Sequence, residues 1–207
     1  MKNKDNYIVL GGKRVELTKE QVRELRAGLG LSERKLSEVK VGDTFKVGDL
    51  EFICLEHREE GTAVLLKDLW KVDKFDNKSN DYSKSSIREE LNTVFAERLK
   101  EAVGGENIVT RIVSLTSDDG REDYEWCTDE VGLMTCDDYR KYVYILDEYR
   151  PEKWWWLATP YSTASNGYSS LVRVVNDDGT LYDNFCCNFE NGVRPFCILK
   201  SDIFVSE

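Results

Sequence analysis

The chain lacks several residues and patterns that mark common catalytic and metal sites. Among 207 residues there is one histidine, His57, and no C-x-x-C pair. A serine or cysteine nucleophile therefore has no obvious general base, and a tetrahedral zinc site would need scattered cysteines. Because His57 lies between Glu56 and Glu59 in an acidic stretch, we expect it to be a surface residue. These absences argue against an enzyme, and we expect neither a metal nor another cofactor.

Positive charge and long apolar runs are also scarce. The 29 Lys and Arg are outnumbered by 39 Asp and Glu, and the net charge is -10. Nucleic-acid binding needs clustered basic residues to release counterions, and the same deficit disfavours anionic membrane surfaces. The first apolar stretch, Tyr7–Leu10, is too short for a signal-peptide core, and no apolar run reaches membrane-spanning length. We expect cytoplasmic synthesis without a signal peptide, no nucleic-acid partner and no membrane insertion.

The composition is that of a folded chain with free thiols. Apolar residues make up 41% and charged residues 33%, which excludes collagen, low-complexity polymers and bulk disorder. The length allows one ordinary domain with a small appendage. Without an export signal, cysteines are expected to stay reduced. The six expected free thiols are Cys54, Cys127, Cys136, Cys186, Cys187 and Cys197.

Short strands and glycine-containing turns run through the chain. Turns are expected at Gly11-Gly12, Gly48-Asp49, residues 118–120, residues 176–179 and Asn191-Gly192. The expected strands are residues 7–10, 13–17, 44–47, 50–55, 62–66, 108–115, 171–175, 180–185 and 193–199, and another strand begins at residues 154–156. Residues 73–83 are expected to form a polar loop.

Three helical segments are predicted between these strands. Two begin at capping boxes, in which a serine or threonine and a residue three positions later satisfy each other's backbone N–H groups. The helices are one from Thr18 with Gln21 to Gly28 or Gly30, one from Ser86 with Glu89 to residues 104–105, and one over residues 137–149. Helices mixed with antiparallel hairpins indicate an α+β fold.

The first 30 or so residues form a separate small unit. Their hairpin and helix carry too little apolar surface to be stable alone. We therefore predict an N-terminal appendage over residues 1–31 that docks on a partner or a second copy, giving a homo-oligomer. The main domain is predicted over residues 32–207.

One segment has an unusual composition. From Leu157 to Phe189, 33 consecutive residues contain no Lys, Glu, Gln, Met or Trp, although these types make up about a fifth of the chain. They are the five types that an asparagine codon ending in a pyrimidine cannot reach by changes at its two adenines. Either the segment is diversified by adenine-directed mutagenesis, or it is a hairpin-rich stretch that avoids helix formers. In both cases its Tyr, Ser, Gly and Asn are typical of binding loops.

Around this segment the chain resembles a family of bacterial and phage domains. The motifs that carry the resemblance are Trp155-Trp-Leu-Ala-Thr-Pro160, Val174-Val-Asn-Asp-Asp-Gly179, Gly192-Val-Arg-Pro195, Tyr82-Ser-Lys-Ser-Ser86 with Ile87-Arg88 and Leu91-Asn92, and Gly132-Leu-Met-Thr-Cys-Asp-Asp-Tyr139. They recur in the family in this order, over roughly residues 35–200.

The resemblance implies a C-type-lectin-like fold of the formylglycine-generating-enzyme branch. That branch includes variable proteins of diversity-generating retroelements, whose C-terminal region displays mutable residues on a fixed scaffold. The chain departs from the family at Ala158, where an arginine usually makes a salt link. The calcium ligands and disulfides of true C-type lectins are not evident, and Cys186-Cys187 does not match the copper-binding cysteines of formylglycine-generating enzymes.

Several conspicuous residues are expected to serve the fold. Strand alternation places Trp155 opposite Trp154 and Trp156, so at least one is core and we expect most to be. Arg194 is expected to be a buried, paired structural residue. Residues 177–179 are expected to form a turn, and residues 73–81 lack the glycine and terminal glutamate of an EF-hand loop, so neither stretch is expected to hold calcium.

We therefore expect a non-enzymatic protein that presents a variable region, residues 157–194, to a protein or glycan ligand, displayed on a phage particle or a cell surface. The candidate ligand-binding residues are Tyr161, Ser162, Ser165, Asn166, Tyr168, Ser169, Tyr182, Asn184, Phe185, Cys186, Asn188 and Phe189. Two alternatives remain open: a thiol or metal enzyme of the formylglycine-generating type, with two cysteines converging in a cleft, and a structural component of a phage or prophage.

Overall fold

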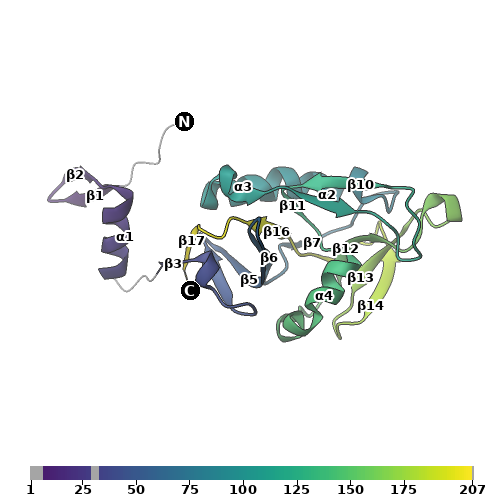
Figure 1. Ribbon diagram of the computed structural model, residues 1–207. Coiled ribbons are helices and arrows are strands. Elements are labelled where there is room, and N and C mark those ends of the chain that lie inside the picture. Colours follow the sequence, from purple (N-terminus) through teal and green to yellow (C-terminus); the bar gives the residue numbers. More distant parts are fainter. Residues whose placement is uncertain (1–6, 29–32, 207) are drawn as a thin grey trace.

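The computed structural model describes residues 7–28 and 33–206 and shows a mixed α+β fold with antiparallel sheets, as predicted (Figure 1). The strands are β1 (Tyr7–Leu10), β2 (Lys13–Glu16), β3 (Glu33–Lys35), β4 (Thr44–Val47), β5 (Leu50–His57), β6 (Thr62–Leu66), β7 (Lys71–Val72), β8 (Ile108–Val109), β9 (Arg111–Ser114), β10 (Trp126–Asp129), β11 (Val131–Gly132), β12 (Trp155–Pro160), β13 (Leu171–Val175), β14 (Leu181–Phe185), β15 (Gly192–Val193), β16 (Phe196–Leu199) and β17 (Phe204–Ser206). The helices are α1 (Lys19–Gly28), α2 (Ser86–Glu90), the π-helical segment η3 (Leu91–Phe95), α3 (Ala96–Val103) and α4 (Cys136–Leu146), with 3₁₀ turns η1 (Leu36–Glu38), η2 (Tyr82–Lys84), η4 (Gly105–Asn107), η5 (Asp147–Tyr149) and η6 (Ala164–Asn166).

Two larger sheets form the body of the chain. An eight-stranded sheet has the order β11-β16-β6-β5-β4-β17-β3, with β8 paired to β16, and a five-stranded sheet has the order β14-β13-β12-β15-β7. The β12–β15 pair is parallel, and the other pairs in these two sheets are antiparallel. β14 is an edge strand, so one of its sides has no strand neighbour in this sheet.

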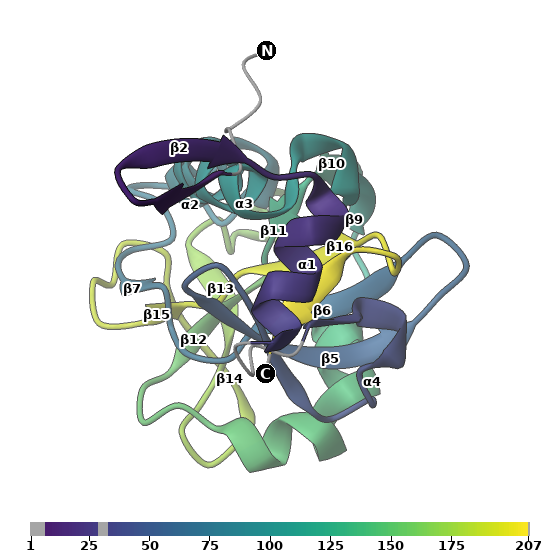
Figure 2. The same cartoon turned by 90° about the vertical axis from the view of Figure 1, so that its left-hand side faces the viewer.

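Helices cover the sheets on both faces. In Figure 1, α2 and α3 lie along the top, above β6 and β16, and α4 lies low in the picture beside β14; Figure 2 shows the chain turned by 90°. Along β12, Trp156 packs into the core cluster that contains the α2–α3 side chains, and Trp155 packs into the cluster beside α4. Both tryptophans are therefore buried and Trp154 is half-buried, which confirms that most of the three are core.

One of the two predicted capping boxes is present, and the other is shifted by one residue. The Thr18–Gln21 box is present, with Thr18 N donating to Gln21 Oε1 at 3.0 Å and Gln21 N donating to Thr18 Oγ1 at 3.2 Å. The box at Ser86 is wrong by one residue, because Ser85 is the N-cap and its Oγ accepts from Arg88 N at 3.3 Å. The helix that follows ends at Gly104, whose φ of 86° explains the glycine.

Two predicted strands are each divided between different partners. Residues 108–115 form β8, which pairs with β16, and β9, which pairs with β10. Residues 193–199 contain parts of β15 and β16, which lie in different sheets. The predicted turn at Asn191-Gly192 is also wrong, because Gly192 is in β15. A Cβ there would lie 2.4 Å from Leu69 Cδ1, so close packing rather than a turn requires the glycine.

The N-terminal hairpin was predicted correctly as β1 and β2, which pair with each other around Gly11 and Gly12. The predicted domain boundary after residue 31 lies outside the described residues. The described part of this unit exposes several apolar side chains, namely Tyr7, Val9, Val15 and Leu25. None of the described helices is both long and apolar enough to cross a membrane.

Candidate functional site

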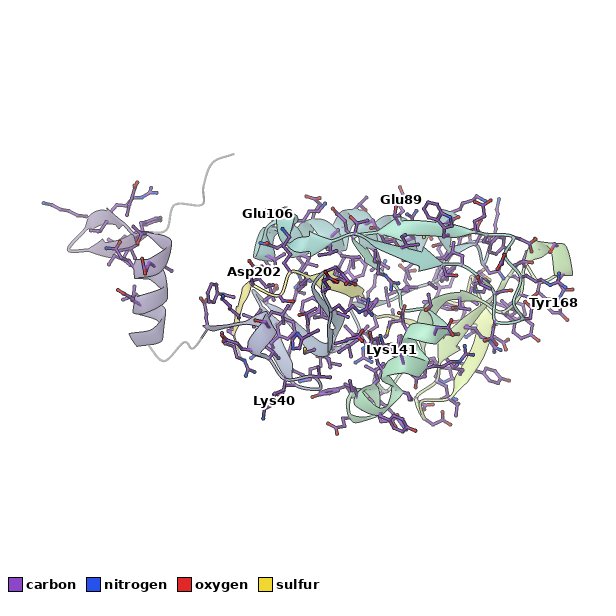
Figure 3. The ribbon with its side chains drawn as sticks, viewed as in Figure 1. Lys40, Glu89, Glu106, Lys141, Tyr168 and Asp202 are labelled. Atoms are coloured by element: carbon purple, nitrogen blue, oxygen red, sulfur yellow. The ribbon has the colours of Figure 1, made fainter. Side chains whose placement is uncertain are left out.

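The twelve predicted ligand-binding residues lie on the loop after β12, on β14 and on the loop after β14. Tyr168 marks the first of these loops. In Figure 3 it lies at the end of the molecule opposite Lys40 and Asp202. The loops at this end connect strands of the five-stranded sheet, so the sheet positions them.

Most of the twelve side chains are accessible. The large aromatic ones are the most exposed, at 63% for Phe189, 59% for Phe185, 56% for Tyr182 and 45% for Tyr168. Ser165, Asn166 and Ser169 are also exposed, and Tyr161, Asn184 and Asn188 are half-buried. Exposed aromatic side chains give a large contact area to a partner at low entropic cost.

Ser162 and Cys186 are buried, contrary to the expectation that they contact a ligand. Ser162 Oγ donates to Asp119 Oδ2 at 2.7 Å, which fixes the loop that carries it. Cys186 N donates to Ser170 O at 2.7 Å, joining the two loops below the surface. Ser162 and Cys186 are of the same residue types as their exposed neighbours in the segment. Only their contacts with distant residues distinguish these two buried positions from the exposed ones.

Alternation along β14 divides the exposed side chains between two faces. Asp183 and Phe185 lie opposite Arg173 and Leu171 of β13 and share one face with them. Tyr182 lies on the other face with Asn184. The predicted site is therefore two surfaces on opposite sides of one edge strand.

The first surface, here the Tyr161 face, consists of Tyr161, Tyr168, Arg173, Asp183 and Phe185. The rings of Tyr161 and Tyr168 meet edge to face with centroids 5.4 Å apart. Arg173 lies 4.9 Å from the Tyr161 ring centroid, and its NH1 is 3.5 Å from Asp183 Oδ1. These contacts orient the two tyrosines beside Arg173 and Asp183, whose opposite charges compensate each other.

The carboxylate of Asp118 holds the Arg173 side chain in place. Its Nε donates to Asp118 Oδ2 at 3.0 Å, and Arg140 NH2 donates to Asp118 Oδ1 at 2.8 Å. Burial raises the pKa of Asp118, but the hydrogen bonds from the two arginines outweigh it and the pKa is lowered overall. Asp118 is therefore ionised at neutral pH and holds both arginines in place.

The second surface, here the Trp154 hollow, is a depression of about 480 Å³ lined by Glu152, Lys153, Trp154, Asp177, Asn184, Glu190 and Asn191. Beside it, Trp154 and Tyr182 meet edge to face with ring centroids 5.5 Å apart. Asn184 Nδ2 donates to Asn191 Oδ1 at 3.4 Å. The hollow combines one tryptophan ring with amides and charged groups, so it offers an aromatic surface together with several hydrogen-bonding side chains.

Asn80 holds the loop after β12 in place. Its Nδ2 lies 2.8 Å from each of the backbone oxygens of Ser162, Tyr168 and Leu171. Its Oδ1 accepts from Tyr124 Oη at 2.8 Å. Asn80 is fully buried, so one side chain connects three points of this loop to the scaffold.

Residues 73–76 support the loop after β14 in a similar way. Phe75 N and Asp76 N donate to Cys186 O at 2.9 and 3.0 Å, and Asp73 N donates to Asn191 O at 3.0 Å. Trp156 Nε1 in turn donates to Asp73 O at 2.9 Å. The scaffold thus binds main-chain atoms of both loops.

Two carboxylates from residues 119–123 also contact the loop after β12. Asp123 Oδ2 accepts from Thr163 Oγ1 and from Ser165 Oγ, the latter at 2.7 Å. The hydroxyl donors lower the pKa of Asp123, led by Thr163, and that of Asp119, led by Ser117. Both carboxylates therefore stay ionised in the pH range where proteins are stable.

Sequence reasoning missed the role of Asn80. The predicted polar loop of residues 73–83 gives no local sign that Asn80 is buried, since Asn77 in the same stretch is exposed. The acids of this stretch are engaged by the protein itself: Asp73 pairs with Lys71 and Asp81 with Lys84. Within the described residues, no group of three or more His, Cys, Asp and Glu side chains is arranged to hold a metal ion.

The cysteines are free and mostly buried, with Cys187 exposed. Burial raises the pKa of Cys54, Cys127, Cys136 and Cys186 to about 11 and that of Cys197 to about 12. Thiols with such pKa values are protonated at neutral pH, and the protonated form is a poor nucleophile.

Arg194 is a buried structural residue, as predicted, but its hydrogen-bond partners are backbone oxygens and not a paired carboxylate. It is 1% exposed, and its guanidinium donates to the backbone oxygens of Leu66 at 2.9 Å, Lys67 at 2.7 Å and Tyr149 at 3.0 Å. Burial lowers its pKa to about 10. His57 is exposed, as predicted, and its ring nitrogens lie 2.8 Å from Val39 O and 2.9 Å from Thr62 Oγ1.

Comparison with known proteins places the chain in one family. No curated protein matches it, and no solved structure does. Residues 60–201 match a family described as "Domain of unknown function (DUF6273)". This segment contains β12, β13, β14, Asn80 and all twelve predicted ligand-binding residues. Since the match extends over more than half of the chain, the protein belongs to the DUF6273 family.

Proposed function

We propose that the protein is a non-enzymatic ligand-binding protein that displays a variable surface on a C-type-lectin-like scaffold, as the variable proteins of diversity-generating retroelements do. The displayed surface consists of the Tyr161 face and the Trp154 hollow, together with Phe189. Its ligand is a protein or a glycan on another particle or cell.

The observation that carries this proposal is that Asn80 and residues 73–76 hold both loops through main-chain atoms. The side-chain bonds of the loop after β12 to Asp119 and Asp123 come from its polar residues and not from its aromatic residues. Asn80 bonds backbone oxygens of the loop after β12, and residues 73–76 bond backbone atoms of the loop after β14. A backbone hydrogen bond does not depend on the side chain of the residue that makes it. The exposed side chains therefore can be exchanged without loss of these bonds, which is the property that a diversified binding surface needs.

The composition of residues 157–189 agrees with this property. The exposed residues of the segment, such as Tyr168, Tyr182 and Phe185, are types that an asparagine codon reaches through its adenines. Hairpin structure alone explains the lack of helix formers, but it does not explain four exposed aromatic side chains. Exposed aromatics at this density favour a binding surface.

The buried thiols count against the alternative of a thiol enzyme. An active cysteine needs an accessible thiolate with a lowered pKa, whereas burial raises the pKa of five of the six thiols. The remaining thiol, Cys187, lies next to Cys186 and has no histidine partner. His57 bonds Val39 and Thr62, and its Nε2 lies 3.8 Å from the Sγ of the buried Cys54 instead.

Two libraries of displayed variants test the proposal. One randomises Ser165, Asn166, Tyr168, Tyr182, Phe185 and Phe189, and the matched control randomises Leu157, Ala158, Val172, Val174, Val175 and Cys186 in the same segment. Resistance to protease measures folding. We expect most members of the first library and few of the second to fold; equal losses would overturn the proposal.

The DNA next to the gene tests the retroelement part. We expect a near-identical repeat that carries adenines at the codons of the exposed residues, beside a reverse transcriptase gene. A neighbourhood without both would contradict diversification and would leave a fixed binding surface.

A further inference from the structure

We infer that the Trp154 hollow binds a neutral hexopyranose unit of a glycan. The inference rests on the proposed ligand-binding function and specifies the chemistry of one of its two surfaces. It is carried by three features of the hollow: its aromatic pair, a buried amide without a partner, and its charge.

The aromatic pair provides a surface for the C–H face of a sugar ring. Trp154 is half-buried and packs on the core, whereas Tyr182 is 56% exposed. Their edge-to-face contact, with an interplanar angle of 66°, keeps the Trp154 ring in a fixed orientation at the hollow. A volume of about 480 Å³ falls within the range of about 300–1,000 Å³ that small-molecule sites occupy.

The amide of Asn191 needs a hydrogen-bond acceptor. Asn191 is 2% exposed, and its Nδ2 has no partner within the described part of the chain. Buried polar groups without partners are rare in folded proteins and point to a missing bond. The other polar atom of this amide, Oδ1, accepts from Asn184 Nδ2 at 3.4 Å, longer than a usual hydrogen bond. A sugar hydroxyl or an N-acetyl carbonyl would supply the acceptor.

The charge of the hollow selects against anions. Glu152, Asp177 and Glu190 line it against a single lysine, Lys153. Phosphates and acidic sugars would be repelled, whereas carboxylates accept hydrogen bonds from neutral hydroxyls. A quaternary ammonium would suit the acids and the rings, but it carries no acceptor for Asn191 Nδ2. A neutral sugar satisfies all three features.

Titration of the full-length protein with cellotriose and with tri-N-acetylchitotriose tests the inference. Tryptophan fluorescence and calorimetry report the binding, with choline and inorganic phosphate as comparison probes. We expect saturable binding of at least one sugar at millimolar or lower concentration and no binding of choline or phosphate.

Three variants locate the binding. Trp154→Ala and Tyr182→Ser each remove one ring, and we expect either to weaken sugar binding at least about tenfold. Because Trp154 is partly buried, thermal unfolding checks its fold, and the exposed Tyr182 provides a second variant. Trp126→Ala is the matched control, since Trp126 is 61% exposed on β10, and we expect its affinity to be unchanged.

Three results would overturn the inference: neither sugar binds, the variants of Trp154 and Tyr182 bind like the control, or choline or phosphate binds in the hollow. None of these would affect the folding of the two libraries. Failure of this inference is therefore distinguishable from failure of the proposed ligand-binding function, and would leave the surface to a protein ligand.

Discussion

Replacement of Asn80 tests whether one buried side chain holds the loop after β12. Its Nδ2 carries two hydrogens, which three backbone oxygens at 2.8 Å share, and its Oδ1 accepts a third hydrogen bond from Tyr124. About three hydrogen bonds at about 1 kcal/mol each give an expected loss of about 3 kcal/mol in the free energy of unfolding for Asn80→Ala. At about 2–4 °C per kcal/mol for a chain of this size, Tm falls by about 6–12 °C.

Urea unfolding followed by circular dichroism measures this loss, and hydrogen exchange of residues 161–171 shows whether it is local. Asn80→Asp keeps the acceptor but places carboxylate oxygen against carbonyl oxygen, so it is expected to destabilise at least as much. Asn77→Ala is the matched control, because Asn77 is exposed in the same stretch, and it should change stability by less than about 0.5 kcal/mol. A loss below about 1 kcal/mol for Asn80→Ala, or equal losses for Asn77 and Asn80, would refute the reasoning.

Three further predictions concern the scaffold. Burial raises the pKa of Glu56, but hydrogen bonds from Lys141, Tyr142 and Arg58 outweigh it and lower the pKa from 4.5 to about 2. The ionised carboxylate therefore stabilises the fold above pH 4.5, and this stabilisation is lost as the pH falls toward 2. Over this range Glu56→Gln should lose less stability than the wild type in acid unfolding, and parallel curves of stability against pH would contradict the prediction. Arg194→Met removes a guanidinium that bonds three buried backbone oxygens and should cost about 3 kcal/mol in urea unfolding; no loss would show that those oxygens find other donors. In the native protein a thiol reagent should modify Cys187 quickly and the five buried thiols only after unfolding; several fast thiols would contradict the burial.

Features that depend on neighbouring residues were predictable. The Thr18–Gln21 capping box, the Gly48 turn and the turn at residues 176–179 each involve residues within four positions of one another. Their hydrogen bonds form locally and need no knowledge of the fold. The run of β-branched residues over 171–175 also predicted β13 correctly, because such residues favour strands whichever strands they pair with.

Features that depend on distant partners were not predictable in detail. Residues 108–115 have one continuous strand pattern, yet the chain divides into β8 and β9 because different sheets lie beside its two halves. Strand alternation alone left open which tryptophan is buried. With α2–α3 on one face and α4 on the other, both Trp155 and Trp156 are buried.

The candidate site shows the same division. The composition of residues 157–189 located the segment that carries the exposed aromatic side chains. It did not separate Cys186 from Phe185, because solvent access depends on whether residues 73–76 cover a position. Nor did it indicate Asn80, whose side-chain bonding partners lie 44 to 91 positions away along the chain.

By itself the sequence determined the α+β class, the acidic charge, the local turns and caps, and the segment in which the exposed aromatic side chains concentrate. These follow from composition, periodicity and hydrogen bonds between near neighbours. Only the tertiary structure decided that the candidate ligand-binding residues of β14 lie on two faces, that Asn191 has an unpaired amide nitrogen at the Trp154 hollow, and that Asn80 supports the loop after β12. Burial and long-range hydrogen bonds exist only once distant segments are packed together.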